Sequence, residues 1–244
     1  MSEIHTETFN VNLDGKIAKS YLAYPKLAKQ TLPAVLVIPE FWGLTEYIKN
    51  RTKQLAELGY CALAVDIYGE GWIAEDVESA SSAMNKLLSE LDKNSKGLLT
   101  HLEELKKLKQ VDETKTAVIG YCLGGALSLH LVRLGTDING AVSFHGDLEA
   151  QTAIQTNQVK AKVLVCHGSA DSMIPKEKVT QFKKEMETAG VNYKFISYPS
   201  ALHGFTNPQA TENGKKFSIP IAYNEQADKA SWEEMQKFFN QIFS

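Results

Sequence analysis

Arginine is scarce in this 244-residue sequence, where Arg51 and Arg133 are the only two among 26 basic residues. Positive charge is not in excess either, since the formal net charge at pH 7 is −3. Nucleic-acid-binding proteins neutralise phosphates with clustered Lys and Arg, and segments that bind membrane surfaces use polybasic runs. Because the sequence has neither pattern, we expect no nucleic acid and no membrane among its partners.

Cysteine is also rare, with Cys61, Cys122 and Cys166 spread widely along the chain. An odd, widely spaced set is a poor disulfide framework, and no CxxC or Cys/His spacing typical of zinc is present. The first residues lack the basic and apolar segments of a signal peptide. No apolar run approaches the roughly 20 residues that span a bilayer. We therefore expect a cytoplasmic protein with no metal site and no cofactor.

The sequence does have a regular alternation of elements. Residues 4–13 and 16–24 alternate polar and apolar side chains around Asp14-Gly15, a dipeptide suited to a two-residue hairpin turn. Short apolar segments follow, as expected of strands buried on both faces of a parallel sheet. The expected strands of this kind are 34–38, 61–65, 116–119, 140–144 and 162–166, and a further strand is expected at 193–197.

Stretches with helical spacing separate these strands. They cover 45–58, 75–91, 95–109, 122–134, 176–189 and 222–242. This alternation predicts an α/β fold: a mostly parallel, twisted sheet flanked by helices, with an N-terminal antiparallel hairpin. No linker divides the chain, so we expect a single domain over residues 1–244, in which segment 69–110 could partly cap the site.

Cys122 is distinguished by the glycines around it. Strand 115–119 leads into Gly120-Tyr121-Cys122-Leu123-Gly124-Gly125, which fits the G-x-S-x-G nucleophile elbow of α/β-hydrolases with cysteine in place of serine. The tight turn exposes the nucleophile and places it at a helix N-terminus, where the helix dipole lowers a thiol pKa. The Leu123 backbone N–H is then an expected oxyanion donor. A small buried cysteine is the alternative, and it is our interpretation of Cys61 and Cys166.

An acid and a histidine follow Cys122 in the order that this fold uses for its catalytic triad. Asp171 lies in the loop after strand 162–166, and His203 lies in the loop after strand 193–197. His203 is expected to accept the thiol proton and later to activate water, while Asp171 orients His203 and stabilises its charged form. Each residue alone could be an ordinary loop residue, so the assignment depends on all three together.

Five segments of the chain together resemble the dienelactone hydrolase (carboxymethylenebutenolidase) family. The Gly-Tyr-Cys-x-Gly-Gly elbow is the most specific of them. The resemblance implies an α/β-hydrolase fold without a cofactor, acting on a small-molecule ester or lactone through an acyl-cysteine intermediate, as a monomer or small homo-oligomer. The segments are Pro39-Glu40-Phe41-Trp42-Gly43-Leu44, Asp66-Ile67-Tyr68-Gly69, the elbow, His167-Gly168-Ser169-Ala170-Asp171 and His203-Gly204-Phe205.

The loop after strand 34–38 adds two expected site residues. In this fold the loop normally supplies the second oxyanion donor, here the backbone N–H of Phe41. The resemblance implies a further role for Glu40, because the family glutamate at this position contacts the resting thiol and takes its proton when substrate arrives. We therefore expect Glu40 to act as a thiol switch, which requires burial to raise its pKa.

The scarcity of arginine bears on the substrate. Family members that act on dienelactone hold the substrate carboxylate with arginines near two of these segments, and arginine is missing at both places. Lys215 or Lys216 could substitute as a point charge, whereas nearby aromatic residues predict a more apolar pocket. The expected substrate-binding residues are Trp42, Tyr68, Trp72, His145 and Phe205.

Two other functions stay open from the sequence. The same triad could serve a thioesterase, or an acyl transferase that uses an acceptor other than water. The chain could also be a catalytically silent binding protein, because one fold hosts many functions. The intact set of nucleophile, acid, base and glycines favours a hydrolase over a silent protein.

Overall fold

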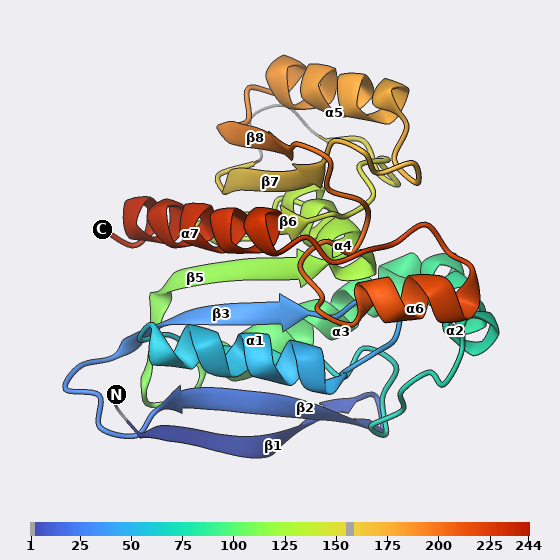
Figure 1. Cartoon of the computed structure of the whole chain (residues 1–244). Coiled ribbons are helices and arrows are strands. Elements are labelled where there is room, and N and C mark those ends of the chain that lie inside the picture. Colours follow the sequence, from blue (N-terminus) through green and yellow to red (C-terminus); the bar gives the residue numbers. More distant parts are fainter. Residues whose placement is uncertain (1–2, 155–158) are drawn as a thin grey trace. The chain divides into compact units, whose positions relative to one another are not determined.

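The computed structural model describes residues 3–154 and 159–244. The chain divides into two compact units, Met1–Val118 and Ile119–Ser244, and the boundary falls inside strand β5 (Val111–Tyr121). Figure 1 follows the elements along the chain. The single domain and the partial cap at 69–110 remain predictions from the sequence.

The first unit begins with an antiparallel hairpin of β1 (Ile4–Leu13) and β2 (Lys16–Pro25), which pair along their whole length. Asp14 and Gly15 both have positive φ angles, 52° and 91°, which suit the expected two-residue hairpin turn. The hairpin predicted from the sequence is therefore confirmed.

The other strands of the first unit continue from this hairpin. Strand β2 pairs antiparallel with β4 (Cys61–Ala64), and β4 pairs parallel with β3 (Leu32–Ile38). The order in this unit is β1-β2-β4-β3-β5. The hairpin is thus the antiparallel edge of strands that otherwise run parallel.

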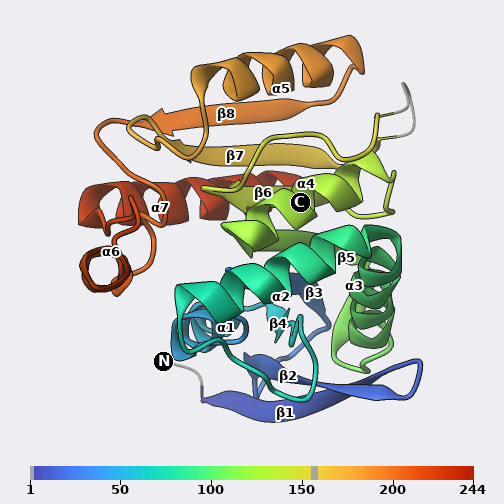
Figure 2. The same ribbon diagram turned by 90° about the vertical axis from the view of Figure 1, so that its right-hand side faces the viewer.

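Three helices belong to the first unit: α1 (Glu46–Glu57), α2 (Val77–Ser89) and α3 (Leu91–Lys106). Helix α1 packs on β2 and β4, and α3 packs on β1 and β3. Figure 2 shows α1 and α3 on opposite faces of these strands. Burial on both faces explains the uninterrupted apolar character of β4, all of whose residues are buried.

The second unit contains the carboxyl end of β5, followed by β6 (Gly140–Phe144), β7 (Lys162–Gly168) and β8 (Tyr193–Tyr198). Their order is β5-β6-β7-β8, and the pairs β6–β7 and β7–β8 are parallel. The carboxyl ends of β6, β7 and β8 therefore lie at one edge, where α/β folds collect their functional side chains.

Four helices complete the second unit: α4 (Leu123–Arg133), α5 (Lys176–Thr188), α6 (Ala210–Phe217) and α7 (Glu225–Ile242). Helix α4 packs on β6, α7 packs on β6 and β7, and α5 packs on β8 through Phe182. Side chains along a strand alternate between its two faces, so β6 can pack against α4 on one face and α7 on the other. Gly140 faces the α7 side chains of Phe238 and Ile242, whereas Ser143 faces α4 at Gly125.

The structure confirms the predicted α/β fold, with mostly parallel strands, flanking helices and the N-terminal hairpin. It differs from the expectation in two elements. Strand β5 begins at Val111, because its first half is polar and partly exposed and so lacks an apolar pattern. Helix α6 was not expected, since Ala210 is its only buried residue.

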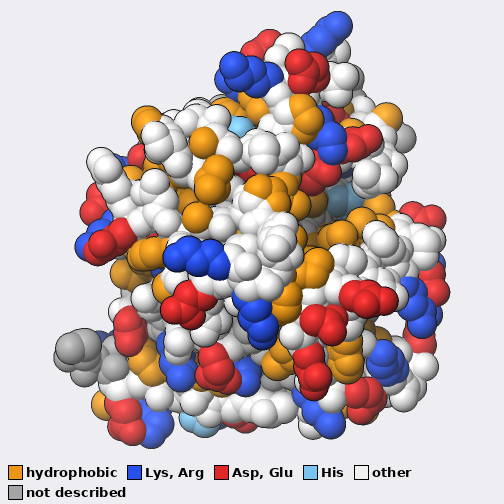
Figure 3. All heavy atoms as spheres, turned by 45° about the vertical axis from the view of Figure 1, so that its right-hand side comes forward, with side chains coloured by type: hydrophobic (Ala, Val, Ile, Leu, Met, Phe, Trp, Pro, Cys, Tyr) orange, Lys and Arg blue, Asp and Glu red, His pale blue; other side chains and the backbone are white. Residues whose placement is uncertain are grey.

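Two features of the molecule bear on its partners. No helix within residues 3–154 and 159–244 is long and apolar enough to cross a membrane. On the face drawn in Figure 3, basic and acidic side chains are interspersed, and neither sign forms a large continuous patch.

Candidate active site

Cys122 lies at the turn from β5 into α4, within the second unit. It is the N-cap of α4 with φ 53° and ψ −115°. A positive φ is uncommon for residues other than glycine, and such strained positions cluster at functional sites. The Cys122 N–H is shared between the carbonyl oxygen of Phe144, at 3.0 Å, and Nδ1 of His145, at 3.2 Å. These bonds hold the turn against the end of β6.

Close packing explains the glycines of the elbow. A Cβ atom at Gly120 would lie 1.9 Å from the carbonyl oxygen of Gly124 in the first turn of α4. A Cβ atom at Gly125 would lie 2.7 Å from the Ser143 hydroxyl on β6. Larger residues at these two positions would push the helix away from the strands, and so displace the cysteine between them.

The three thiols have different surroundings. Cys122 is half-buried, whereas Cys61 and Cys166 are buried. Burial raises the pKa of the Cys61 thiol to about 12 and that of the Cys166 thiol to about 12. Both are therefore protonated at neutral pH, which leaves Cys122 as the accessible thiol of the chain.

Asp171 and His203 form a buried pair in the second unit. Oδ2 of Asp171 lies 2.8 Å from Nδ1 of His203, and the exposed fractions of the two side chains are 0% and 7%. The other carboxylate oxygen, Oδ1, accepts the backbone N–H of Met173 at 2.9 Å. An acceptor at Nδ1 fixes the proton there, which leaves Nε2 able to accept a proton.

The pKa of His203 is raised well above its usual value. Burial is the largest single influence and lowers this pKa, but the charges of Cys122 and Asp171 and the hydrogen bonds to the same two residues together outweigh it. Nε2 is buried and has no hydrogen-bond partner of normal geometry in the described part of the chain. The influence of Cys122 on the His203 pKa indicates that the two side chains are close to each other.

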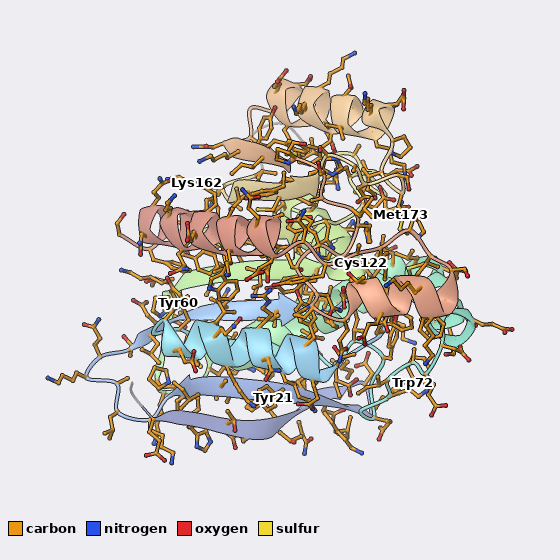
Figure 4. All side chains as sticks on the ribbon, in the orientation of Figure 1. Tyr21, Tyr60, Trp72, Cys122, Lys162 and Met173 are labelled. Carbon is orange, nitrogen blue, oxygen red and sulfur yellow. The ribbon has the colours of Figure 1, made fainter. Side chains whose placement is uncertain are left out.

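The loops that carry Asp171 and His203 support each other. The N–H of Ala170 donates to the carbonyl oxygen of Ala201 at 3.0 Å, and a Cβ atom at Gly168 would lie 2.4 Å from that oxygen. The loops after β7 and β8 are thus closely packed against each other. Figure 4 shows Cys122 and Met173 beyond the carboxyl ends of this unit's strands.

Of the expected substrate-binding residues, His145 lies against the His203 ring and Phe205 lies against His145. The exposed fractions of His145 and Phe205 are 1% and 0%. The His145 ring lies 5.3 Å from the His203 ring and 5.2 Å from the Phe205 ring, both edge to face. Nε2 of His145 is 2.7 Å from the hydroxyl of Thr206. Both side chains are thus almost entirely enclosed by protein atoms.

Apart from Leu123, the first residue of α4, the other expected site residues belong to the first unit. Glu40 and Trp42 are buried and Phe41 is half-buried in the loop after β3. The Tyr68 hydroxyl donates to the carbonyl oxygen of Phe41 at 2.8 Å, and the N–H of Ala74 donates to that of Trp42 at 3.0 Å. The segment after β4 therefore fixes the conformation of the loop that carries Glu40 and Phe41.

Tyr68 and Trp72 line a cavity of the first unit. Its volume is ≈ 690 Å³, and it is bounded by the hairpin turn and by α2 and α3. The two rings meet edge to face at 5.2 Å, and Trp72 remains 40% exposed. The structure thus places these two expected residues beside open space, unlike the buried Trp42, His145 and Phe205.

The two arginines are engaged elsewhere. Arg133 is buried in α4 and makes a bidentate pair with Glu185 at 2.9 and 2.8 Å. Arg51 is buried in α1 and lies over the Tyr47 ring. Lys215 and Lys216 are exposed in the last turn of α6. No arginine is therefore free to form a fork with a substrate carboxylate.

Sequence reasoning missed two residues of this site, one that contacts Asp171 and one that contacts His145. Met173 contacts Asp171 through its backbone, and Thr206 reaches the His145 ring through its hydroxyl. A backbone contact leaves no trace in residue type, and a lone threonine in a loop carries no pattern. Their proximity to the expected triad in the sequence was the only available signal.

Comparisons with known proteins agree with the sequence resemblance. The profile of the dienelactone hydrolase family matches residues 18–243. A relative from Salmonella typhimurium, named "Putative carboxymethylenebutenolidase", is 24% identical over 231 residues, which are 91% of this chain and 82% of its own. "Protein usf" from Aquifex pyrophilus is 28% identical over 199 residues, 80% of this chain and 84% of its own.

Solved structures share the fold over nearly the whole chain. A dienelactone hydrolase-like promiscuous phosphotriesterase from metagenomic libraries has a TM-score of 0.90 and 28% identity, with 98% of each chain covered. The structure called m3DLH has a TM-score of 0.91 and 29% identity, with 99% of each chain covered. Because the family match spans far more than half of the sequence, this chain belongs to the dienelactone hydrolase family and is an ester or lactone hydrolase of that kind.

Proposed function

We propose that this enzyme cleaves ester or lactone bonds with a Cys122–His203–Asp171 triad and an acyl-cysteine intermediate. The observation that carries the proposal is the buried pair of Asp171 and His203, joined at 2.8 Å, together with a His203 pKa that Cys122 raises. A thiol, a base and an orienting acid arranged in this way are the parts of nucleophilic acyl transfer.

The reaction proceeds in two halves. The Cys122 thiolate attacks the substrate carbonyl carbon, and the backbone N–H of Leu123, at the start of α4, donates to the oxyanion. The oxyanion then expels the alkoxide, which takes a proton from the His203 imidazolium, and a thioester remains on Cys122. The roles of the Phe41 N–H as second oxyanion donor and of Glu40 as thiol switch stay predictions from the sequence.

Water completes the reaction. His203 removes a proton from water as the water oxygen attacks the thioester carbonyl, and a second oxyanion forms. Its collapse breaks the carbon–sulfur bond, releases the carboxylic acid and returns the thiolate–imidazolium pair. Asp171 keeps its negative charge throughout and holds the imidazole by Nδ1.

The substrates we propose are activated esters and lactones without an essential carboxylate. A thiolate is a better leaving group than an ordinary alkoxide, so a cysteine nucleophile favours acyl groups whose leaving group is itself stabilised, such as enol lactones. Both arginines of the chain are buried in helices, and so cannot form the bidentate bonds by which a carboxylate is usually recognised.

A substrate panel tests the proposal. It contains a dienelactone, p-nitrophenyl acetate, an acyl-CoA and, because a similar structure is a phosphotriesterase, a phosphotriester. We expect Cys122→Ala to abolish turnover of the ester or the lactone, and Cys61→Ala, which removes a buried thiol, to keep it. Turnover of the acyl-CoA alone would favour a thioesterase, and no turnover at all would favour a silent binding protein.

A trapping experiment tests the intermediate itself. Acid quenching during turnover of p-nitrophenyl acetate, followed by peptide mass spectrometry, should find an acetyl group on Cys122. An acetyl group absent at every quench time, in an enzyme that does turn over, would contradict the covalent mechanism.

A further inference from the structure

We infer that His145 is a positioning residue, which holds the Cys122 turn and the His203 loop at the spacing that proton transfer needs. The inference includes Thr206, whose hydroxyl oxygen accepts the Nε2 proton of His145. It rests on the proposed triad, since only a Cys122–His203 reaction gives this spacing a function.

The backbone of His145 is firmly placed. The residue follows β6 with φ 43°, a left-handed value that histidine adopts more readily than most residues. Its N–H donates to the carbonyl oxygen of Cys166 on β7 at 2.8 Å. The next residue, Gly146, has no room for a side chain, because its Cβ would lie 2.6 Å from the Ala126 nitrogen of α4. The ring therefore projects from a rigid support.

The hydrogen bonds of His145 define its tautomer. Nδ1 faces the backbone N–H of Cys122 at 3.2 Å, and a peptide N–H can only donate, so Nδ1 is unprotonated. The proton then lies on Nε2 and is donated to the Thr206 hydroxyl oxygen at 2.7 Å. If both ring nitrogens carried protons, the Nδ1–H of His145 would face the backbone N–H of Cys122, and two donors would oppose each other. His145 is thus neutral in this arrangement.

The His145 side chain thus links the turn that carries Cys122 to the loop that carries His203. The Nδ1 bond reaches the turn that carries the thiol, and the Nε2 bond reaches a hydroxyl three residues after His203. The His145 ring also packs edge to face on the His203 ring, at 5.3 Å and 64°. Because a misplacement of about 1 Å can slow a reaction about 100-fold, a link of this kind has direct kinetic consequences.

The alternative is that His145 only fills space between the two loops. Packing alone would make the protein less stable when contacts are lost, but would not depend on one hydroxyl acceptor. Replacing Thr206 by valine keeps the shape of the side chain and removes that acceptor, whereas serine keeps the acceptor and removes a methyl group. The two variants separate the hydrogen bond from the packing.

The first experiment compares wild type, Thr206→Val, Thr206→Ser and the control Thr180→Val, whose hydroxyl bonds to the Lys176 carbonyl within α5. We expect Thr206→Val to lower kcat about three- to tenfold, the effect of one lost hydrogen bond, with KM unchanged. The rate of Cys122 alkylation by iodoacetamide should fall with it. Thr206→Ser should restore both rates, and the control should match wild type.

A second variant covers the case in which Thr206→Val does not fold. His145→Asn tolerates the positive φ but is too short to bond with Thr206. It should lower kcat and the alkylation rate by at least as much. Wild-type values of both rates in whichever variant folds, even with a lowered Tm, would overturn the positioning role. Wild-type turnover in Cys122→Ala would instead reject the triad itself, so the two failures are distinguishable.

Discussion

Replacing Asp171 by asparagine removes one negative charge and one hydrogen-bond acceptor beside His203. The native carboxylate accepts two donors, the Nδ1–H of His203 at 2.8 Å and the Met173 N–H at 2.9 Å. Asparagine has a single acceptor oxygen, so it can satisfy only one of them. The peptide N–H of Met173 cannot move its proton to another atom, whereas the imidazole of His203 can. We therefore expect His203 to change its tautomer.

In the expected arrangement the asparagine oxygen faces Met173 and its NH₂ group faces Nδ1 of His203. The ring proton then moves to Nε2, where it prevents His203 from accepting a proton during the reaction. A wrong tautomer of this kind lowers kcat by on the order of 10³- to 10⁴-fold in triad enzymes. The Met173 N–H keeps its acceptor and Nδ1 of His203 keeps a hydrogen-bond partner, so the free energy of unfolding should change by only about 1 kcal/mol.

The assay is steady-state hydrolysis of p-nitrophenyl acetate, together with urea unfolding of the same samples. Asp112→Asn is the matched control, because Asp112 also accepts a backbone N–H, from Thr114 at 3.1 Å, near the start of β5 and outside the site. A kcat within tenfold of wild type in folded Asp171→Asn would refute the orienting role of Asp171. A large loss of stability would show that the asparagine oxygen faces His203 instead.

Two further results are expected. His203 should titrate at a lower pH in Cys122→Ala than in wild type, as measured by NMR of the imidazole. The reason is that the charge of Cys122 is the largest of the influences that raise the His203 pKa, so burial lowers this pKa with less opposition when the thiol is removed. An unchanged His203 pKa would contradict this coupling. Gly120→Ala should destabilise the protein by about 3 kcal/mol or more in urea unfolding, since its Cβ would lie 1.9 Å from the Gly124 oxygen. Gly97 lies in the middle of α3, where an added Cβ would be 3.6 Å from the nearest neighbouring side chain. Gly97→Ala should therefore be neutral or stabilise the protein by up to about 1 kcal/mol.

The sequence predicted those parts of the fold that depend on local chemistry. Asp14-Gly15 predicted the hairpin, since both residues accept the positive φ angles of its turn. The glycines around Cys122 predicted the elbow, because only glycine fits beside α4 and β6. The buried parallel strands were found by their apolar character alone.

The missed parts depend on tertiary contacts. Strand β5 starts at Val111 among exposed polar residues, so only its pairing defines that end. Helix α6 contains Gly214 and just one buried residue, so neither helix propensity nor an apolar face indicates it. The contact of Thr206 with His145 joins two loops 61 residues apart, and no local pattern encodes it.

The burial of two of the three thiols determines how this enzyme responds to oxidants. Peroxide oxidises an accessible thiolate to a sulfenic acid, which a second thiol can rescue by forming a disulfide. Cys61 and Cys166 are buried and protonated, so neither can attack an oxidised Cys122. Without an added small thiol, we expect peroxide to convert Cys122 to the sulfinic acid, detected as a gain of two oxygen atoms by mass spectrometry, and a disulfide within the chain would contradict this. Activity would then survive an oxidative episode only where a soluble thiol such as glutathione caps the sulfenic acid first.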